Sequence, residues 1–259
     1  MTTLTETPAK QVFKLAQSWL DLLKTVGDEA DVELVTGCSE TVLLAHKLVL
    51  KTRCDFFKTK FSPPWDNSSA SERAIVKLPN ISTDTVEVVL EYIYGGLLQK
   101  ETIFYKQLNL YEAYKFLLLD DAGAFMLDLI RTSLSHANEE IRIRHLRIIR
   151  YRSDPDLTNL TISCLAREIT NAFRLFVEPK RKWKICQIVK IIDTCDLLVK
   201  VMECAWSGCG KGADVSHFSH LANAMNMLGH WINMHDSIPP EDYQTILEVI
   251  MDLFANVDV

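Results

Sequence analysis

The stretch that decides the fold is Asp31-Val-Glu-Leu-Val-Thr36, followed by Gly37-Cys-Ser-Glu40 and Thr41-Val-Leu-Leu-Ala45. Apolar and polar residues alternate in the first segment, turn-forming residues follow, and a second apolar segment ends the stretch. This pattern predicts a β-hairpin with strands at 31–36 and 41–45. The segments on either side of the hairpin predict helices and one further strand.

An amphipathic helix is predicted before the hairpin, over residues 11–26. Apolar residues recur there at steps of three and four: Phe13, Ala16, Leu20, Leu23 and Val26. Gly27 stands where such a helix would end. The apolar stripe must be buried, either against the core of this chain or against a partner.

Helical spacing returns after the hairpin, over residues 47–61, where the apolar positions are Leu48, Phe56, Phe57 and Phe61. Residues 62–71 are turn-rich and polar apart from Trp65, so they predict a loop, and 74–78 predict a short strand. A helix capped by Ser82 or Thr83 ends at Gly95-Gly96. Two more helices follow, at about 105–118 and 121–135. The order predicts an α+β fold, a small sheet flanked by helices.

The chain changes character beyond residue 136, where the sequence predicts an all-α region. A run from Arg142 to Arg152 interleaves apolar residues with five arginines. Helical patterns then cover 157–177, 182–207, 214–234 and 240–255. No internal repeat of fixed period is present, which argues against a solenoid.

Bulk composition excludes several classes of protein. The chain has 259 residues, of which 48% are hydrophobic and 24% charged, as in globular proteins with a core. A formal net charge of −6 argues against a nucleic-acid partner. No apolar run reaches the roughly 18–20 residues of a membrane span, and no signal peptide is visible. Seven scattered cysteines suit a reducing compartment. We therefore expect the cytoplasm or the nucleus, or both.

Catalytic and metal-binding motifs are not found, so we expect no enzyme, no cofactor and no metal. The sequence Gly208-Cys-Gly-Lys-Gly212 lacks both the first glycine and the magnesium-binding hydroxyl of a phosphate loop. Four side chains could ligate zinc, but their spacing is not that of a common finger: Cys204, Cys209, His217 and His220. His46 lies at a strand-to-helix turn, where a structural role is expected.

The basic run from Arg142 to Arg152 leaves two interpretations open. It could bind an acidic partner, an anionic lipid or a phosphate backbone. It could equally be the solvated face of a helix whose other face is buried.

Five pieces of the first half, in order, resemble the BTB/POZ domain family: Asp31-Val-Glu-Leu34, Ala45-His-Lys-Leu-Val-Leu50, Arg53-Cys-Asp-Phe-Phe57, Val76-Lys-Leu-Pro79 and Val89-Leu-Glu-Tyr-Ile-Tyr-Gly-Gly96. The family pattern is an Asp-led strand, an Ala-His-basic turn into a helix, an aromatic pair, a third strand and a Tyr-rich helix end. The resemblance spans residues 11–132. It implies the BTB/POZ fold, with 136–259 as a helical, BACK-like region.

The resemblance also implies homodimerisation. In many BTB domains the N-terminal helix swaps onto the partner, which would bury Phe13, Leu20 and Leu23. The family often places an acidic and a basic residue in a buried pocket at the dimer centre, here Asp31 and Lys47. Two buried charges persist only when paired, and loss of one costs roughly 3–5 kcal/mol.

The family's best-known activity is to serve as substrate adaptor for cullin-3 ubiquitin ligases. The resemblance assigns a cullin-facing surface to the loop after residue 61 and the helices after Gly96, with Phe61, Trp65, Asp66 and Tyr105 on it. Neither Pro64-Trp-Asp66 nor Ala70-Ser-Glu72 is a good copy of the hydrophobic-x-Glu motif of many binders. No recognition module follows the helical region. We therefore expect an interaction module that homodimerises and acts as a cullin-3 adaptor for an unknown client. The alternative is a dimerising scaffold or transcriptional regulator without a ligase role.

Overall fold

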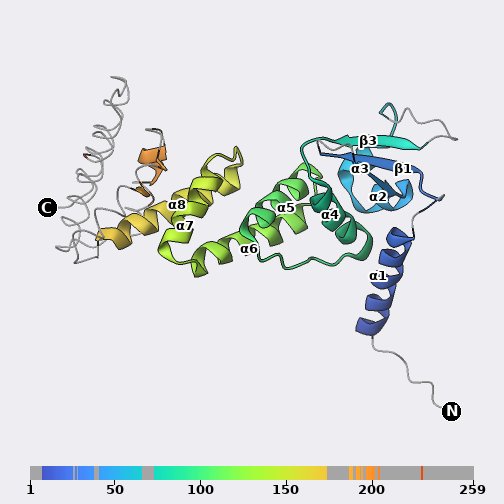
Figure 1. Cartoon of the computed structure of the whole chain (residues 1–259), viewed down its shortest axis with the longest axis horizontal. Coiled ribbons are helices and arrows are strands. Elements are labelled where there is room, and N and C mark those ends of the chain that lie inside the picture. Colours follow the sequence, from blue (N-terminus) through green and yellow to red (C-terminus); the bar gives the residue numbers. More distant parts are fainter. Residues whose placement is uncertain are drawn as a thin grey trace, which may run out of the picture. The chain divides into compact units, whose positions relative to one another are not determined.

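The computed structural model describes residues 8–25, 27, 29–37, 41–65, 73–173, 187–188, 191–192, 194, 197–201, 204 and 229. The chain divides into two compact units, Met1–Ser133 and Leu134–Val259, drawn in Figure 1. Each unit is described by itself below.

Unit 1 contains a mixed sheet with the strand order β2-β1-β3 among its described residues. β1 (Val32–Thr36) pairs antiparallel with β2 (Thr41–Ala45), with Leu34 opposite Leu43. The predicted hairpin is therefore confirmed. β1 also pairs in parallel with β3 (Ala74–Leu78), which places Leu34 opposite Val76. Alternate residues of β1 and β3 are buried, so one face of these strands lies on the core.

The helices of unit 1 are α1 (Pro8–Lys24), α2 (Lys47–Arg53), α3 (Asp55–Lys60), α4 (Thr83–Gly95) and α5 (Phe104–Phe116); α6 (Asp120–His136) begins in unit 1 and ends just beyond it. Gly96 ends α4 in the left-handed conformation, at φ 69°, which glycine adopts without steric cost. The core of the unit is built mainly from large side chains of β1 and of these helices: Leu34, Leu50, Phe57, Ile93, Tyr94, Leu108, Tyr111, Tyr114 and Met126. This arrangement is the predicted α+β fold, a small sheet flanked by helices.

The single helix predicted over 47–61 is wrong, because Cys54 divides it into α2 and α3. Cys54 is extended, with φ −145° and ψ 118°, and its thiol donates a hydrogen bond to the carbonyl of Leu117 at 3.2 Å. An extended residue cannot continue the helical hydrogen-bond ladder. Leu48, expected among the apolar marks of this helix, is 76% exposed.

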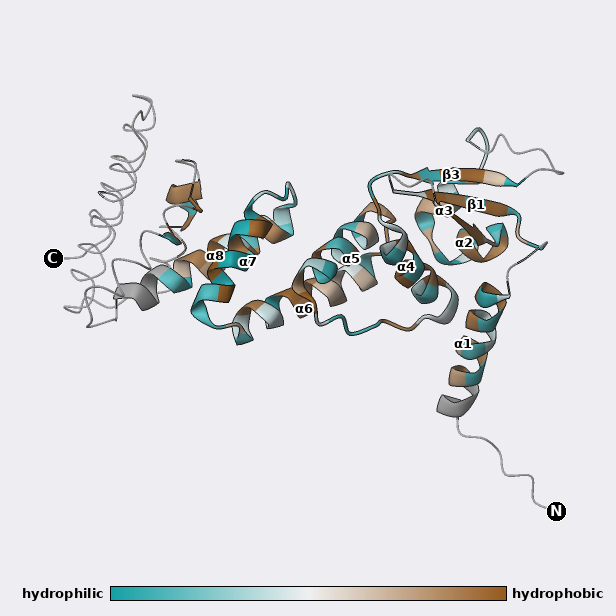
Figure 2. Cartoon of the chain, viewed as in Figure 1, coloured by the Kyte–Doolittle hydropathy of each residue, from teal (hydrophilic) through white to brown (hydrophobic). Residues whose placement is uncertain are grey.

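The described part of unit 2 is dominated by α7 (Glu139–Arg150) and α8 (Pro155–Phe173). α7 buries Ile143, Leu146 and Ile149 and exposes Arg144 and Arg147. The basic run therefore includes the solvated face of a helix whose other face is buried, as one of its two interpretations predicted. Figure 2 shows both hydrophobic residues (brown) and hydrophilic residues (teal) along α7 and α8. The predicted helix over 157–177 is present as α8, whereas those over 214–234 and 240–255, and most of 182–207, lie outside the described residues.

Across the described ranges, no helix is both long enough and apolar enough to cross a membrane.

Candidate interaction surfaces

The C-terminal half of α1 is docked on α4 within the same chain. Ala16 is buried, and Leu20 lies so close to Gly95 that a Cβ built on the glycine would stand 3.0 Å from the Cγ of Leu20. That separation is shorter than carbon atoms in contact adopt. Gly95 therefore lets Leu20 approach the α4 backbone. Leu23 is half-buried on the same helix.

The N-terminal half of α1 is open to solvent. Val12, Phe13 and Leu15 are exposed, and Phe13 shows 60% of its surface. The stripe predicted as one buried face is thus divided: Leu20 packs inside unit 1, and Phe13 does not. We refer to Val12, Phe13 and Leu15 together as the exposed apolar residues of α1. Leu48 of α2, predicted as one of the apolar positions of the 47–61 helix, is exposed, whereas Val49 and Leu50 after it are buried. Thr52, one turn further along the same face of α2, is polar, and this is the sequence signal for an exposed face.

Asp31 and Lys47 are in contact at the start of α2, where the Asp31 side chain binds the main chain of Lys47. Oδ1 of Asp31 accepts a hydrogen bond from the backbone N–H of Lys47 at 2.6 Å. The N-cap residue of α2, His46, makes no side-chain capping bond, so Asp31 satisfies one of the N–H groups that a helix start leaves open. The ammonium of Lys47 lies 5.2 Å from the ring centroid of Phe61, a cation–π distance.

In the single chain this pair is not enclosed: Asp31 is exposed and Lys47 is half-buried. Their predicted place in a buried pocket at a dimer centre stays a prediction.

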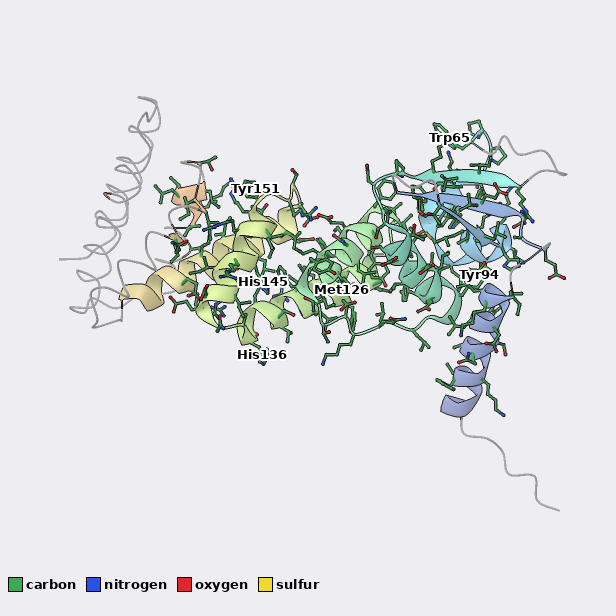
Figure 3. All side chains as sticks on the ribbon, in the orientation of Figure 1. Trp65, Tyr94, Met126, His136, His145 and Tyr151 are labelled. Atoms are coloured by element: carbon green, nitrogen blue, oxygen red, sulfur yellow. The ribbon has the colours of Figure 1, made fainter. Side chains whose placement is uncertain are left out.

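His46 is held by Tyr94 of α4, labelled in Figure 3. The Tyr94 hydroxyl accepts a hydrogen bond from the backbone N–H of His46 at 2.8 Å and lies 3.0 Å from its ring Nδ1. Burial raises the pKa of Tyr94 to about 12, although the hydrogen bond from His46 acts in the opposite direction. The neutral phenol is thus the stable form, and it ties the end of β2 to α4.

The residues assigned to the cullin-facing surface do not share one environment. Trp65, labelled in Figure 3, is 65% exposed, and Tyr105 is also exposed. Phe61 is only 3% exposed and stacks on Phe57 with ring centroids 5.9 Å apart. Its assignment to a surface is therefore corrected: Phe61 belongs to the core beneath. Asp66 lies outside the described residues.

No group of three or more metal-ligating side chains gathers anywhere in the part of the chain that the structure describes. Of the four candidate zinc ligands only Cys204 is described, and it is a free thiol. The other three, Cys209, His217 and His220, lie outside the described residues.

Comparison with known proteins gives a family for the first half of the chain. The family model described as BTB/POZ domain matches residues 20–128. Similar solved structures include the BTB domain of human gigaxonin, with 17% identity and a TM-score of 0.37 over 49% of this chain and 98% of that one. They also include the BTB domain of zebrafish PATZ1, with 21% identity and a TM-score of 0.39 over 51% of this chain and 100% of that one. No curated protein matches the chain significantly. The chain therefore carries a BTB/POZ domain at residues 20–128, a module of a family whose general role is protein–protein interaction.

Proposed function

We propose that this chain is an interaction scaffold that homodimerises through its BTB domain. The observation that carries the proposal is that Val12, Phe13 and Leu15, the exposed apolar residues of α1, are open to solvent in the single chain. Each large apolar side chain removed from water contributes about 1.5–3 kcal/mol. A helix already docked on α4 by Leu20 presents Phe13 in a fixed position, which lowers the entropy cost of binding a second copy.

Light scattering on the full chain tests the dimer. We expect the wild type to have twice the monomer mass and Phe13→Asp to shift it toward the monomer. Phe13 is exposed in the single chain, so the change should leave the fold intact. Ile103→Asp is the matched control, since Ile103 is an exposed residue at the N-cap of α5, where aspartate is tolerated. A wild-type monomer, or equal masses for all three proteins, would contradict the proposal.

The predicted role of Asp31 at the dimer centre needs a test that separates charge from capping. Asp31→Asn keeps an oxygen acceptor for the Lys47 N–H, whereas Asp31→Ala removes it. If the charge serves the dimer, Asp31→Asn dissociates it without lowering monomer stability. If capping is the whole role, Asp31→Asn remains dimeric and Asp31→Ala is destabilised by about 0.5–2 kcal/mol.

Cullin-3 binding is the second candidate function, and it is favoured by two exposed aromatic residues, Trp65 and Tyr105. Exposed aromatic side chains on a folded domain are frequent anchors of protein interfaces. Together with an unknown client, this would make the chain a ligase adaptor. Without it, the chain is a dimerising scaffold or transcriptional regulator.

Calorimetric titration with the purified N-terminal domain of cullin-3 distinguishes the two. We expect Trp65→Ala and Tyr105→Ala each to weaken binding by at least about tenfold. Tyr151→Ala, which removes an exposed aromatic from unit 2, serves as the control. Asp66→Ala extends the test to the remaining assigned residue. No binding by the wild type would leave the scaffold role alone.

A further inference from the structure

β3 is an edge strand of the sheet among the described residues, because the strand order is β2-β1-β3. Figure 1 shows β3 running beside β1. On this side the two strands are bonded from end to end. The N–H of Ala74 donates to the carbonyl of Asp31 at 2.9 Å, and the carbonyl of Leu78 accepts from the N–H of Gly37 at 3.2 Å. The inner edge of β3 is thus fully used by β1.

The outer edge of β3 is formed by the main-chain groups of Ile75 and Lys77. Alternate residues of a strand direct both their N–H and their C=O to the same side, so these two residues point away from β1. Within the ranges that the structure describes, no residue bonds to the two N–H and two C=O groups. Both side chains lie on the outer face of the sheet, where Ile75 is 60% exposed and Lys77 is exposed. Such a row of donors and acceptors is a template for another extended chain.

The side chains along this edge favour an acidic partner strand. The neighbour of Lys77 on β1 is the apolar Val35. Glu33, the neighbour of Ile75, pairs with Arg73 at 3.4 Å. In the described part of the chain no carboxylate pairs with Lys77. An acidic residue placed beside Lys77 would form a cross-strand pair of opposite charge, and an apolar residue two positions away would pack on Ile75.

We propose that the outer edge of β3 binds an extended segment of a partner protein by strand addition, with an acidic residue beside Lys77 and an apolar residue beside Ile75. Main-chain hydrogen bonds to the two outward residues supply the affinity, and the two side chains supply the preference for sequence. The site is separate from the exposed apolar residues of α1, so it does not depend on dimerisation.

A second copy of this chain fits the edge less well than an acidic segment does. Two copies related by a two-fold axis would pair their β3 strands antiparallel. Lys77 would then lie opposite Arg73, Ile75 or a second Lys77, depending on the register, and none of these balances its charge. A lysine on an edge strand is a common means of preventing such pairing. The five-residue edge is roughly 17 Å long, which suits a short segment but is small for a stable interface between two domains.

Random decapeptides displayed on phage and selected against the full chain provide the probe. We expect enriched sequences to alternate apolar residues with Asp or Glu. Each enriched peptide is then synthesised with a methyl group on one main-chain nitrogen at a time. In strand addition the peptide N–H groups that face β3 recur at every second residue. Methylation at those positions should weaken binding about tenfold, and methylation at the positions between them should change it little.

Two variants of the chain test the same edge from the other side. Ile75→Pro removes an outward N–H that is not bonded to β1, and proline is tolerated in an edge strand at such a position. Ile75→Val keeps the N–H and is the matched control. We expect about tenfold weaker binding by Ile75→Pro and nearly unchanged binding by Ile75→Val. Lys77→Glu, which reverses an exposed charge, should weaken the acidic peptides as well.

Circular dichroism checks the fold of each variant, and the methylation scan keeps the test valid if Ile75→Pro fails to fold. The proposal is overturned if no peptides are enriched, if the scan shows no two-residue period, or if folded Ile75→Pro binds like the wild type. A wild-type mass above that of a dimer that falls in Ile75→Pro would also overturn it, because the edge would then belong to a second copy.

Discussion

The BTB domain and the α7–α8 pair of unit 2 use polar groups in different ways. In the BTB domain, hydrogen bonds in which at most one group is charged join elements that are distant in sequence, and the ion pair of Arg73 with Glu33 is partly exposed to solvent. The Tyr94 hydroxyl binds the backbone of His46, and the Arg53 guanidinium donates to the carbonyls of Ile93 and Tyr94 at the end of α4. In unit 2, an ion pair joins Arg142 of α7 to Glu168 of α8 at 2.9 Å.

This difference predicts that the stability of unit 2 depends more strongly on a charged pair than the stability of the BTB domain does. Glu168 is 1% exposed, so its carboxylate is withdrawn from water beside a half-buried arginine. Such a pair contributes little compared with an apolar pair of the same volume, but it makes removal of one partner costly. Loss of a neutral hydrogen bond in the BTB domain costs less.

The largest expected effect comes from Glu168→Ala. It leaves Arg142 half-buried without its partner carboxylate, and we expect unit 2 to lose about 3–5 kcal/mol of stability. Hydrogen exchange followed by mass spectrometry would show faster exchange in peptides of α7 and α8, with the peptides of β1 and α4 unchanged. The double variant Arg142→Met/Glu168→Leu should recover most of the loss. If the amide hydrogens of Glu168→Ala exchange at the same rates as those of the wild type, the ion pair does not contribute to the stability of unit 2.

Tyr94→Phe is next, with an expected loss of about 1–3 kcal/mol in the BTB domain, because the backbone N–H of His46 loses its acceptor. The variant also tests the raised pKa of Tyr94. A group whose pKa rises from the ordinary value near 10 to about 12 on folding contributes stability that is complete below pH 10 and is lost between pH 10 and 12. Urea denaturation across that range should show a shallower decline for Tyr94→Phe than for the wild type.

A smaller loss of stability is expected in unit 2 when His145 is protonated at acidic pH. Burial lowers the pKa of His145, so the folded chain holds that proton less tightly than the unfolded chain does. Stability from this group is present above the ordinary pKa near 6.5 and declines as the pH falls below it. Hydrogen exchange of α7 peptides at pH 5 and 7 should differ less in His145→Gln than in the wild type. Equal differences would remove His145 as the cause.

The smallest effect is expected for Glu140→Ala on the exposed face of α7. Its ion pair with Arg144 is solvent-exposed and four residues apart on one helix, which is worth about 0.3–0.5 kcal/mol. Thermal unfolding of the variant should be nearly that of the wild type, and a large shift would mean that the charged face of α7 is more than a solvated surface.

Regular spacing explains which parts of the fold could be predicted from the sequence. β1 alternates over five residues, and α7 repeats its apolar positions at helical steps, so local pattern and final structure agree. The break at Cys54 could not be predicted, because helical spacing continues through it. It accompanies a hydrogen bond to Leu117, which is 63 residues away.

The surface residues were harder to predict, because their exposure also depends on contacts with residues that are distant in sequence. Phe61 and Trp65 are both aromatic and only four positions apart, yet one stacks on Phe57 in the core and the other faces solvent. Asp31 could be identified as important from its place at the head of a strand. Its contact with the main chain of Lys47 depends on how β1 and α2 meet in space.

The parallel pairing of β1 with β3 has a consequence for synthesis on the ribosome. β2, α2 and α3 all lie between the two strands in the chain, because parallel neighbours require a crossover connection. The central strand, β1, therefore has one edge without its partner until Leu78 has left the exit tunnel. The hydrogen bond between the His46 N–H and the Tyr94 hydroxyl forms later still. A nascent chain stalled before residue 74 exposes a template for pairing with another nascent chain, so this domain is most exposed to aggregation midway through its translation.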